Sequence, residues 1–193
     1  MKVLYFHQHF SSPDGSAGIR SYGMSQRLLE KGHEVTIICG SYLLAKTGLE
    51  GSFVNGERRG VVDGITVIEF ELDYDNSHGF FKRSITFLKY AIRGIKLLFK
   101  EDYDLIFSSS TPLTAGIPGI IGRIFKNKPF IFEVRDLWPE LPKQMGVIKN
   151  PFILSLMSLL EYCSYKSADH IVALSPGIAE GIHKRGVKKC DIS

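Results

Sequence analysis

The chain has 193 residues, 44% of them hydrophobic and 23% charged, which suits one globular domain with a substantial core of its own. The net charge of +4 is too small for a dedicated nucleic-acid binder, so we expect no nucleic-acid partner, although it suits nucleotide phosphates or acidic lipid headgroups. The amino-terminal apolar run is too short for a signal peptide and no stretch reaches about 18 apolar residues, so we expect a cytoplasmic protein that does not span a membrane.

Short apolar runs alternate with longer stretches of helical period along the whole chain. The runs are Val3–Phe6, Val35–Cys39, Ile65–Phe70, Leu105–Phe107, Phe130–Phe132 and Ile171–Leu174. This alternation predicts an α/β fold, with a Rossmann-like parallel sheet flanked by helices on both faces and ligands at the carboxyl ends of the strands. Between Thr47 and Gly64 the pattern lapses into glycines and charges, which predicts a loop or hairpin before the third strand.

A loop of small residues follows the first strand and leads into a helix. Gly15, Ser16 and Gly18 would let backbone amides approach an anion. Arg20, about one turn into the helix, would add a fixed positive charge near the helix amino terminus, whose dipole also favours an anion. The loop matches neither GxGxxG nor a P-loop, so a tight turn between strand and helix explains it equally well.

The segment from about Phe80 to Lys100 predicts a long amphipathic and basic helix. Its apolar stripe is Ile85, Leu88, Ile92, Ile95 and Phe99, and its basic stripe is Lys89, Arg93, Lys96 and Lys100. One interpretation packs the helix on the sheet and leaves a solvated positive face. The other docks the helix on anionic lipid through Lys89, Arg93 and Lys96, helped by neighbouring aromatic residues.

Hydroxyl side chains follow the fourth strand and precede another helix. Ser109 and Ser110 stand where helix caps are favoured, and capping by itself explains most of this pattern. The functional alternative has one or both hydroxyls facing the same cleft as Asp136.

The run Glu133 to Glu140 begins where a buried strand ends and includes the only tryptophan of the chain. Asp136 could interact with an acceptor hydroxyl, Arg135 could offset a developing phosphate charge, and Trp138 could stack on a sugar face. A structural interpretation instead places Trp138 in the core and Asp136 at a turn. His7 and His9 are interpreted as loop or core histidines, and no cluster has metal-ligand spacing, so we expect neither a metal nor a cofactor.

Several motifs in order resemble the amino-terminal half of retaining GT-B glycosyltransferases of family 4, especially the branch that builds bacterial O-antigen, capsule and exopolysaccharide. The resemblance covers essentially the whole chain. Its motifs are His9-Phe10 with Pro13-Asp14, Arg20, the segments 31–36, 63–65 and 129–140, Glu161 with 165–169, and 173–176.

The resemblance assigns roles to the candidate residues. It implies catalytic roles for Asp136 and Arg135, a loop near the donor phosphates that contains Gly15, Ser16, Gly18 and Arg20, and acceptor contacts at Ser109, Ser110, Trp138 and Glu140. Ser16 stands where the family commonly has a second glycine, and Arg135 stands where the wider family often has histidine. No obvious general base remains, in keeping with retaining chemistry, in which the donor phosphate helps to deprotonate the acceptor.

The family's nucleotide-sugar site lies in a carboxyl-terminal Rossmann domain, which would follow Ser193, so residues 1–193 are expected to form one domain that is inactive alone. We therefore expect the acceptor-binding half of an enzyme that moves a sugar from a nucleotide-sugar donor to a lipid-linked or saccharide acceptor, in contact with the inner face of the membrane. The alternative is a noncatalytic subunit that anchors a split glycosyltransferase at the membrane. A sugar-nucleotide epimerase of the same architecture is a weaker third interpretation.

Overall fold

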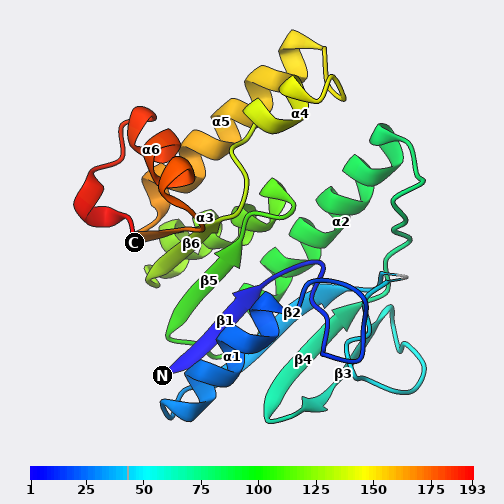
Figure 1. Ribbon diagram of the computed structural model, residues 1–193. Coiled ribbons are helices and arrows are strands. Elements are labelled where there is room, and N and C mark those ends of the chain that lie inside the picture. Colours follow the sequence, from blue (N-terminus) through cyan, green and yellow to red (C-terminus); the bar gives the residue numbers. More distant parts are fainter. Residues whose placement is uncertain (43) are drawn as a thin grey trace.

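The computed structural model describes residues 1–42 and 44–193. One sheet of seven strands runs through the molecule (Figure 1). The strands are β1 (Lys2–Phe6), β2 (Glu34–Gly40), β3 (Glu57–Val62), β4 (Ile65–Phe70), β5 (Leu105–Ser109), β6 (Phe130–Val134) and β7 (His170–Ala173). The helices are α1 (Arg20–Glu30), α2 (Phe80–Leu98), α3 (Gly116–Lys126), α4 (Glu140–Gln144), α5 (Pro151–Ser167) and α6 (Pro176–Lys184), with short 3-10 turns at Leu113–Ala115 and Lys189–Asp191.

The strand order is β3-β4-β2-β1-β5-β6-β7, and all neighbours are parallel except β3 and β4. The predicted α/β fold is confirmed. All six apolar runs form strands, as expected. The hairpin expected before the third run is β3 with its turn to β4, in which Asp63 and Gly64 both have positive φ. The chain order reverses direction between β1 and β5, and open parallel sheets bind ligands at such a switch point.

Helices cover both faces of the sheet and create two cores. Tyr5 and Ile37 point toward α1, where Leu28 packs against the same cluster. Leu4 and Phe6 point to the opposite face, which α2 and α3 cover (Figure 1). Both sheet faces are therefore buried, which explains why the central strands are nearly continuous apolar runs.

The apolar stripe predicted for α2 does not pack on the sheet. Leu88 is 51% exposed and Phe99 is 56% exposed, and Ile85 and Ile92 are exposed as well. The helix instead buries a face of small residues and long aromatic or aliphatic ones: Thr86, Tyr90, Ala91, Gly94, Leu97 and Leu98. The helix packs on the sheet and leaves Lys89 and Lys96 exposed, as one interpretation expects, but this second face and not the apolar stripe contacts β1 and β2.

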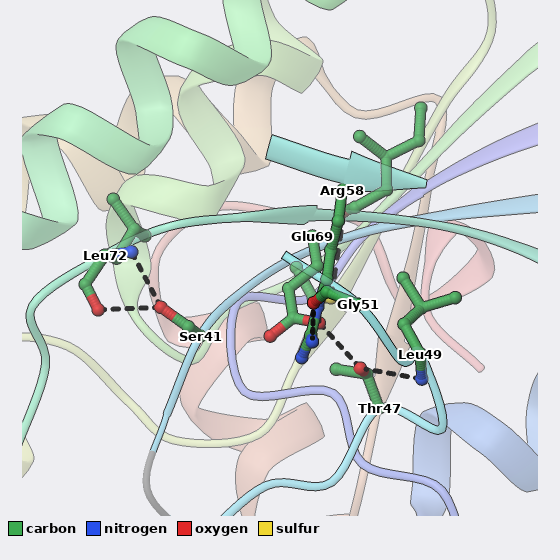
Figure 2. A network of polar contacts seen from close by, with 9 residues as sticks. Ser41, Thr47, Leu49, Gly51, Arg58, Glu69 and Leu72 are labelled. Carbon is green, nitrogen blue, oxygen red and sulfur yellow. Dashed lines mark hydrogen bonds and ion pairs between the residues drawn. The ribbon is translucent and has the colours of Figure 1, made fainter. Parts of the chain in front are cut away.

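A polar network fixes the segment between β2 and β3 to the hairpin (Figure 2). The buried carboxylate of Glu69 accepts hydrogen bonds from Thr47 Oγ1 at 2.6 Å and from Arg58 Nε at 2.8 Å. Ser41 Oγ donates to the carbonyl of Leu72 at 2.8 Å and accepts from its amide at 2.7 Å. The chain leaving β2 is thus tied to the chain leaving β4, although neither segment is helix or strand.

Candidate functional site

A cavity of about 280 Å³ opens at the carboxyl edge of the sheet, beside the switch point between β1 and β5. Segments that follow five different strands line it. The lining residues are His7, His9, Ser16, Ala17, Gly18, Tyr42, Leu44, Tyr74, Asn76, Thr111 and Arg135. The sheet therefore brings together side chains that are far apart in the sequence, at the edge where the sequence predicts a site.

Arg135 and His7 are two lining residues of this cavity that contact each other. Arg135 Nη1 lies 3.2 Å from His7 Nε2, and His7 Nδ1 lies 2.6 Å from Ser21 Oγ. A guanidinium only donates hydrogen bonds, so His7 Nε2 accepts and Nδ1 carries the proton. Burial and the charge of Arg135 lower the pKa of His7 to about 3, and His7 is therefore neutral at pH 7.

Arg135 consequently keeps its positive charge free for a ligand. No carboxylate in the described parts of the chain lies within ion-pair distance of its guanidinium. Ser110 Oγ accepts from the Arg135 amide at 2.9 Å and fixes the backbone at this point. A guanidinium held in this way can accept a phosphate at its remaining N–H groups.

Arg20 is paired with a buried carboxylate. Its Nε donates to Glu133 Oε1 at 2.7 Å, and Glu133 also accepts from Ser109 Oγ at 2.8 Å. Glu133 is 1% exposed, whereas the Arg20 side chain is 43% exposed. Glu133 thus offsets the charge of Arg20 and orients its guanidinium, a role that sequence reasoning did not assign to the strand residue.

The loop from Gly15 to Gly18 is arranged differently at each residue. A side chain at Gly15 would meet Ser11 Oγ and the Lys46 amide, so this glycine allows close packing of two segments. The amide and hydroxyl of Ser16 both donate to the Leu44 carbonyl at 3.1 Å. Gly18 is open and lies next to Arg135 Nη2, 4.0 Å from the position of a Cβ. Gly18 and Arg135 are therefore the part of this loop region that an anion can approach.

The residues predicted to touch an acceptor are mostly engaged in structure. Ser109 and Ser110 are fully buried and hold Glu133 and Arg135. Glu140 accepts from Arg185 Nη2 at 2.9 Å, and Trp138 packs against the core beside α5. These four residues and Asp136 do not line the cavity, so the structure brings only Arg135, Ser16 and Gly18 of the predicted site to its wall.

A group of aromatic residues in the cavity lining was not predicted to bind a ligand: His9, Tyr42 and Tyr74. The rings of His9 and Tyr74 have centroids 4.6 Å apart, and those of Tyr42 and Tyr74 are 5.2 Å apart. Burial and the charge of Arg135 lower the pKa of His9 to about 4, which leaves this imidazole neutral. Tyr42 and Tyr74 follow β2 and β4, and the only sequence signal for them is an aromatic residue just beyond the end of a buried strand.

The three predicted membrane-docking residues do not share one environment. Lys89 and Lys96 are exposed on α2, whereas the Arg93 guanidinium lies over the Phe70 ring at 4.4 Å and near Glu57. Among the described residues, no helix is both long and apolar enough to cross a bilayer. Residues 1–42 and 44–193 also contain no group of three or more His, Cys, Asp or Glu side chains that could hold a metal ion.

Solved glycosyltransferase structures share this fold. Sucrose-phosphate synthase from Thermosynechococcus elongatus matches 97% of the chain with a TM-score of 0.63 and 14% identity, over 45% of its own length. HepE from Anabaena, solved with UDP and glucose, matches 100% with a TM-score of 0.58 and 15% identity, over 43% of its length. The lipopolysaccharide outer core galactosyltransferase WaaB matches 100% with a TM-score of 0.55 and 17% identity, over 44% of its length.

The chain thus spans less than half of the length of these structures and corresponds to one half of their GT-B architecture. No curated protein sequence matches it significantly. The family model described as Glycosyltransferase Family 4 matches residues 17–193. The chain therefore belongs to glycosyltransferase family 4.

Proposed function

We propose that this chain is the acceptor-binding half of a retaining glycosyltransferase. It would move a sugar from a nucleotide-sugar donor to a lipid-linked or saccharide acceptor in the synthesis of a cell-surface polysaccharide. Family membership supports the transferase chemistry, and the order of motifs around residues 129–140 supports the polysaccharide branch. The donor nucleotide would bind mainly to a second Rossmann domain, as the GT-B architecture requires.

The unpaired charge of Arg135 in the cavity is the observation that carries this proposal. A leaving nucleoside diphosphate gains negative charge as the sugar departs, and a fixed cation at that position lowers the barrier. The side-chain hydrogen-bond partner of Arg135 is the neutral His7, so no carboxylate neutralises the charge of Arg135. Gly18 lets a phosphate come close, and the first turn of α1 has no side-chain cap that would compete for its amides.

The test is a transfer assay on the polypeptide as the cell makes it, with UDP-sugars as donors and lipid extract or saccharides as acceptors. Arg135→Gln should lower the transfer rate by about 100-fold or more, as removal of one charge-stabilising group does elsewhere. Arg59→Gln, in an exposed ion pair on β3, is the matched control and should leave the rate unchanged. Normal transfer by the Arg135 variant, an inverted anomeric product, or epimerisation in place of transfer would each contradict the proposal.

We also propose that the outer helical layer contacts an anionic bilayer. α3 packs between α2 and α5 on one side of the sheet (Figure 1). Their exposed apolar side chains are Phe81, Ile85, Leu88 and Ile92 on α2, with Phe99 directly after it, Ile124 and Phe125 on α3, and Phe152, Leu156, Leu159 and Tyr162 on α5. The single acidic residue within these three helices is Glu161, which is buried, while exposed lysines such as Lys89, Lys96 and Lys126 accompany the apolar groups.

Flotation with vesicles that contain anionic lipid tests this contact. Lys89→Glu with Lys96→Glu should release the protein, and added salt should do the same, since the attraction is electrostatic. Arg93 is left intact because it packs on β4. Arg27→Glu with Lys31→Glu alters the same number of charges on and beside α1, on the opposite side of the sheet, and should float like the wild type. Equal flotation of both double variants would exclude this surface.

The exposed apolar layer also favours the second candidate, a noncatalytic subunit that anchors a donor-domain chain at the membrane. The two candidates differ in what Arg135 does. An anchoring subunit needs Lys89 and Lys96 for membrane binding but does not need the cavity, so its Arg135→Gln variant would still support full sugar transfer by the assembled enzyme. A transferase half needs the two lysines for membrane binding and Arg135 for sugar transfer.

A further inference from the structure

We propose that the aromatic wall of the cavity, made of His9, Tyr42 and Tyr74, binds a sugar ring of the acceptor and sets acceptor specificity. This inference rests on the transferase function proposed above and names a part of the site that the motif residues do not include. Within the wall, the His9 ring contacts Tyr42 and Tyr74, and Arg135 lines the same cavity and acts electrostatically on His9. A ring on this wall would thus lie next to the cation expected at the donor phosphate.

The wall offers the apolar face and the polar edge that a pyranose needs. Sugar C–H groups pack on aromatic faces, and the three rings lie against one another, with centroids 4.6 to 5.3 Å apart. At the rim, Asn76 Nδ2 donates to Tyr42 Oη at 2.6 Å and Tyr74 Oη donates to Asn76 Oδ1 at 3.2 Å. Tyr42 Oη and Asn76 keep further N–H and O–H groups that can bond sugar hydroxyls.

Two polar atoms in the cavity wall lack partners. His9 Nδ1 and Thr111 Oγ1 are buried and make no hydrogen bond within the described chain. Buried polar atoms of this kind cost stability unless something satisfies them. Both residues line the cavity, so hydroxyl groups of a bound sugar are suitable partners for them.

The protein holds the two tyrosines in place without a ligand. Ser41 and Leu72 are joined by two hydrogen bonds, and they precede Tyr42 and Tyr74 by one and two residues (Figure 2). The Phe87 ring of α2 packs against the Tyr74 ring, with centroids 5.5 Å apart. The wall is therefore preorganised, which reduces the entropy lost when a ring binds. The cavity volume of about 280 Å³ suits one small ring rather than a long oligosaccharide.

The first measurement is saturation-transfer NMR of p-nitrophenyl monosaccharides with the polypeptide as the cell makes it. We expect transfer to the sugar ring protons in the wild type and its loss in Tyr42→Ala and Tyr74→Ala. This readout needs no turnover. If the protein binds monosaccharides but catalyses no sugar transfer, the aromatic wall is supported as a sugar site and the transferase function is rejected. If no monosaccharide shows an NMR saturation-transfer signal, the assignment of the wall as a sugar site is overturned.

The second measurement is steady-state kinetics with the same glycosides as acceptors and UDP-sugars as donors. Tyr42→Ala and Tyr74→Ala should each raise the acceptor KM about tenfold, since a stacked ring contributes about one factor of ten in affinity. Tyr74→Phe, which keeps the ring, should have a smaller effect, and donor KM should stay constant. Phe53→Ala, a partly exposed aromatic outside the cavity, is the control. A rise in donor KM, or a lower Tm with both KM values unchanged, would overturn the assignment.

Discussion

At the scale of single residues, the site depends on how each charge is compensated. Arg20 and Arg135 are both arginines near the carboxyl ends of strands, yet Glu133 neutralises the first and His7 leaves the second charged. Sequence reasoning placed both at the donor phosphates and could not separate them, because the partner of each comes from another strand. Because Glu133 accepts a hydrogen bond from the Arg20 guanidinium, it is a positioning residue for Arg20.

We expect Glu133→Gln to lower kcat/KM of sugar transfer about tenfold, because Arg20 would lose the carboxylate that orients it. The free energy of unfolding should fall by about 1 kcal/mol, since the amide can still accept from Ser109. Glu69→Gln is the matched control: Glu69 is also buried and also accepts from an arginine Nε and a hydroxyl. Unfolding in urea and donor kinetics on both variants check this. A loss of donor turnover equal in both would show that the effect is one of stability.

At the scale of elements, small residues decide how closely the helices approach the sheet. A Cβ at Gly119 of α3 would clash with the Phe130 ring, whereas a Cβ at Gly23 of α1 would meet nothing within 4 Å. Gly119 therefore allows α3 to pack closely against β6, while Gly23 only lowers the helix propensity of α1. The same principle applies to α2 at Gly94, where a Cβ would lie 3.0 Å from Phe6 Cε1 and from Pro118 Cγ.

Two substitutions of glycine by alanine should consequently have opposite effects. Gly119→Ala should lower the free energy of unfolding by about 1–3 kcal/mol, because the Phe130 ring has to move within a packed core. Gly23→Ala should raise it by about 0.5–1 kcal/mol through better helix propensity. Urea unfolding of both variants is the measurement. If Gly119→Ala were as stable as the wild type, the close fit of α3 on β6 would be contradicted.

At the scale of the whole molecule, Glu161 connects the carboxyl-terminal helices with the loop after β6. It lies on α5, accepts from Tyr165 Oη at 2.9 Å and from the Trp138 amide at 3.2 Å, and has Arg185 Nε 3.0 Å from Oε2. Burial raises its pKa to about 7, and the Tyr165 hydrogen bond and the Arg185 charge only partly oppose this. The Arg185 contact is not aligned as a hydrogen bond, in keeping with its limited effect.

This pKa predicts a dependence of stability on pH. The folded protein binds the Glu161 proton more tightly than the unfolded chain, so the stabilisation is complete below about pH 4.5 and is lost as the pH rises to about 7. Wild type should therefore lose on the order of 3 kcal/mol relative to Glu161→Gln between pH 4.5 and 8. Glu50→Gln, which removes an exposed carboxylate that is not among the groups acting on Glu161, should keep the wild-type slope. Parallel pH profiles for wild type and Glu161→Gln would refute the raised pKa.

The sequence by itself determined the α/β class, the six apolar strands, the length of α2 and the edge of the sheet where the cavity opens. These follow from local patterns, since a strand buried on both faces has to be apolar and parallel strands expose their carboxyl ends together. The cavity wall, the partners of the two arginines and the outward face of α2 were decided by tertiary structure alone. Each depends on which distant segments the strand order places side by side, and the pattern of residues along the chain does not specify that order. Tyr42 and Tyr74, for example, are in contact because β2 and β4 are neighbours in the sheet.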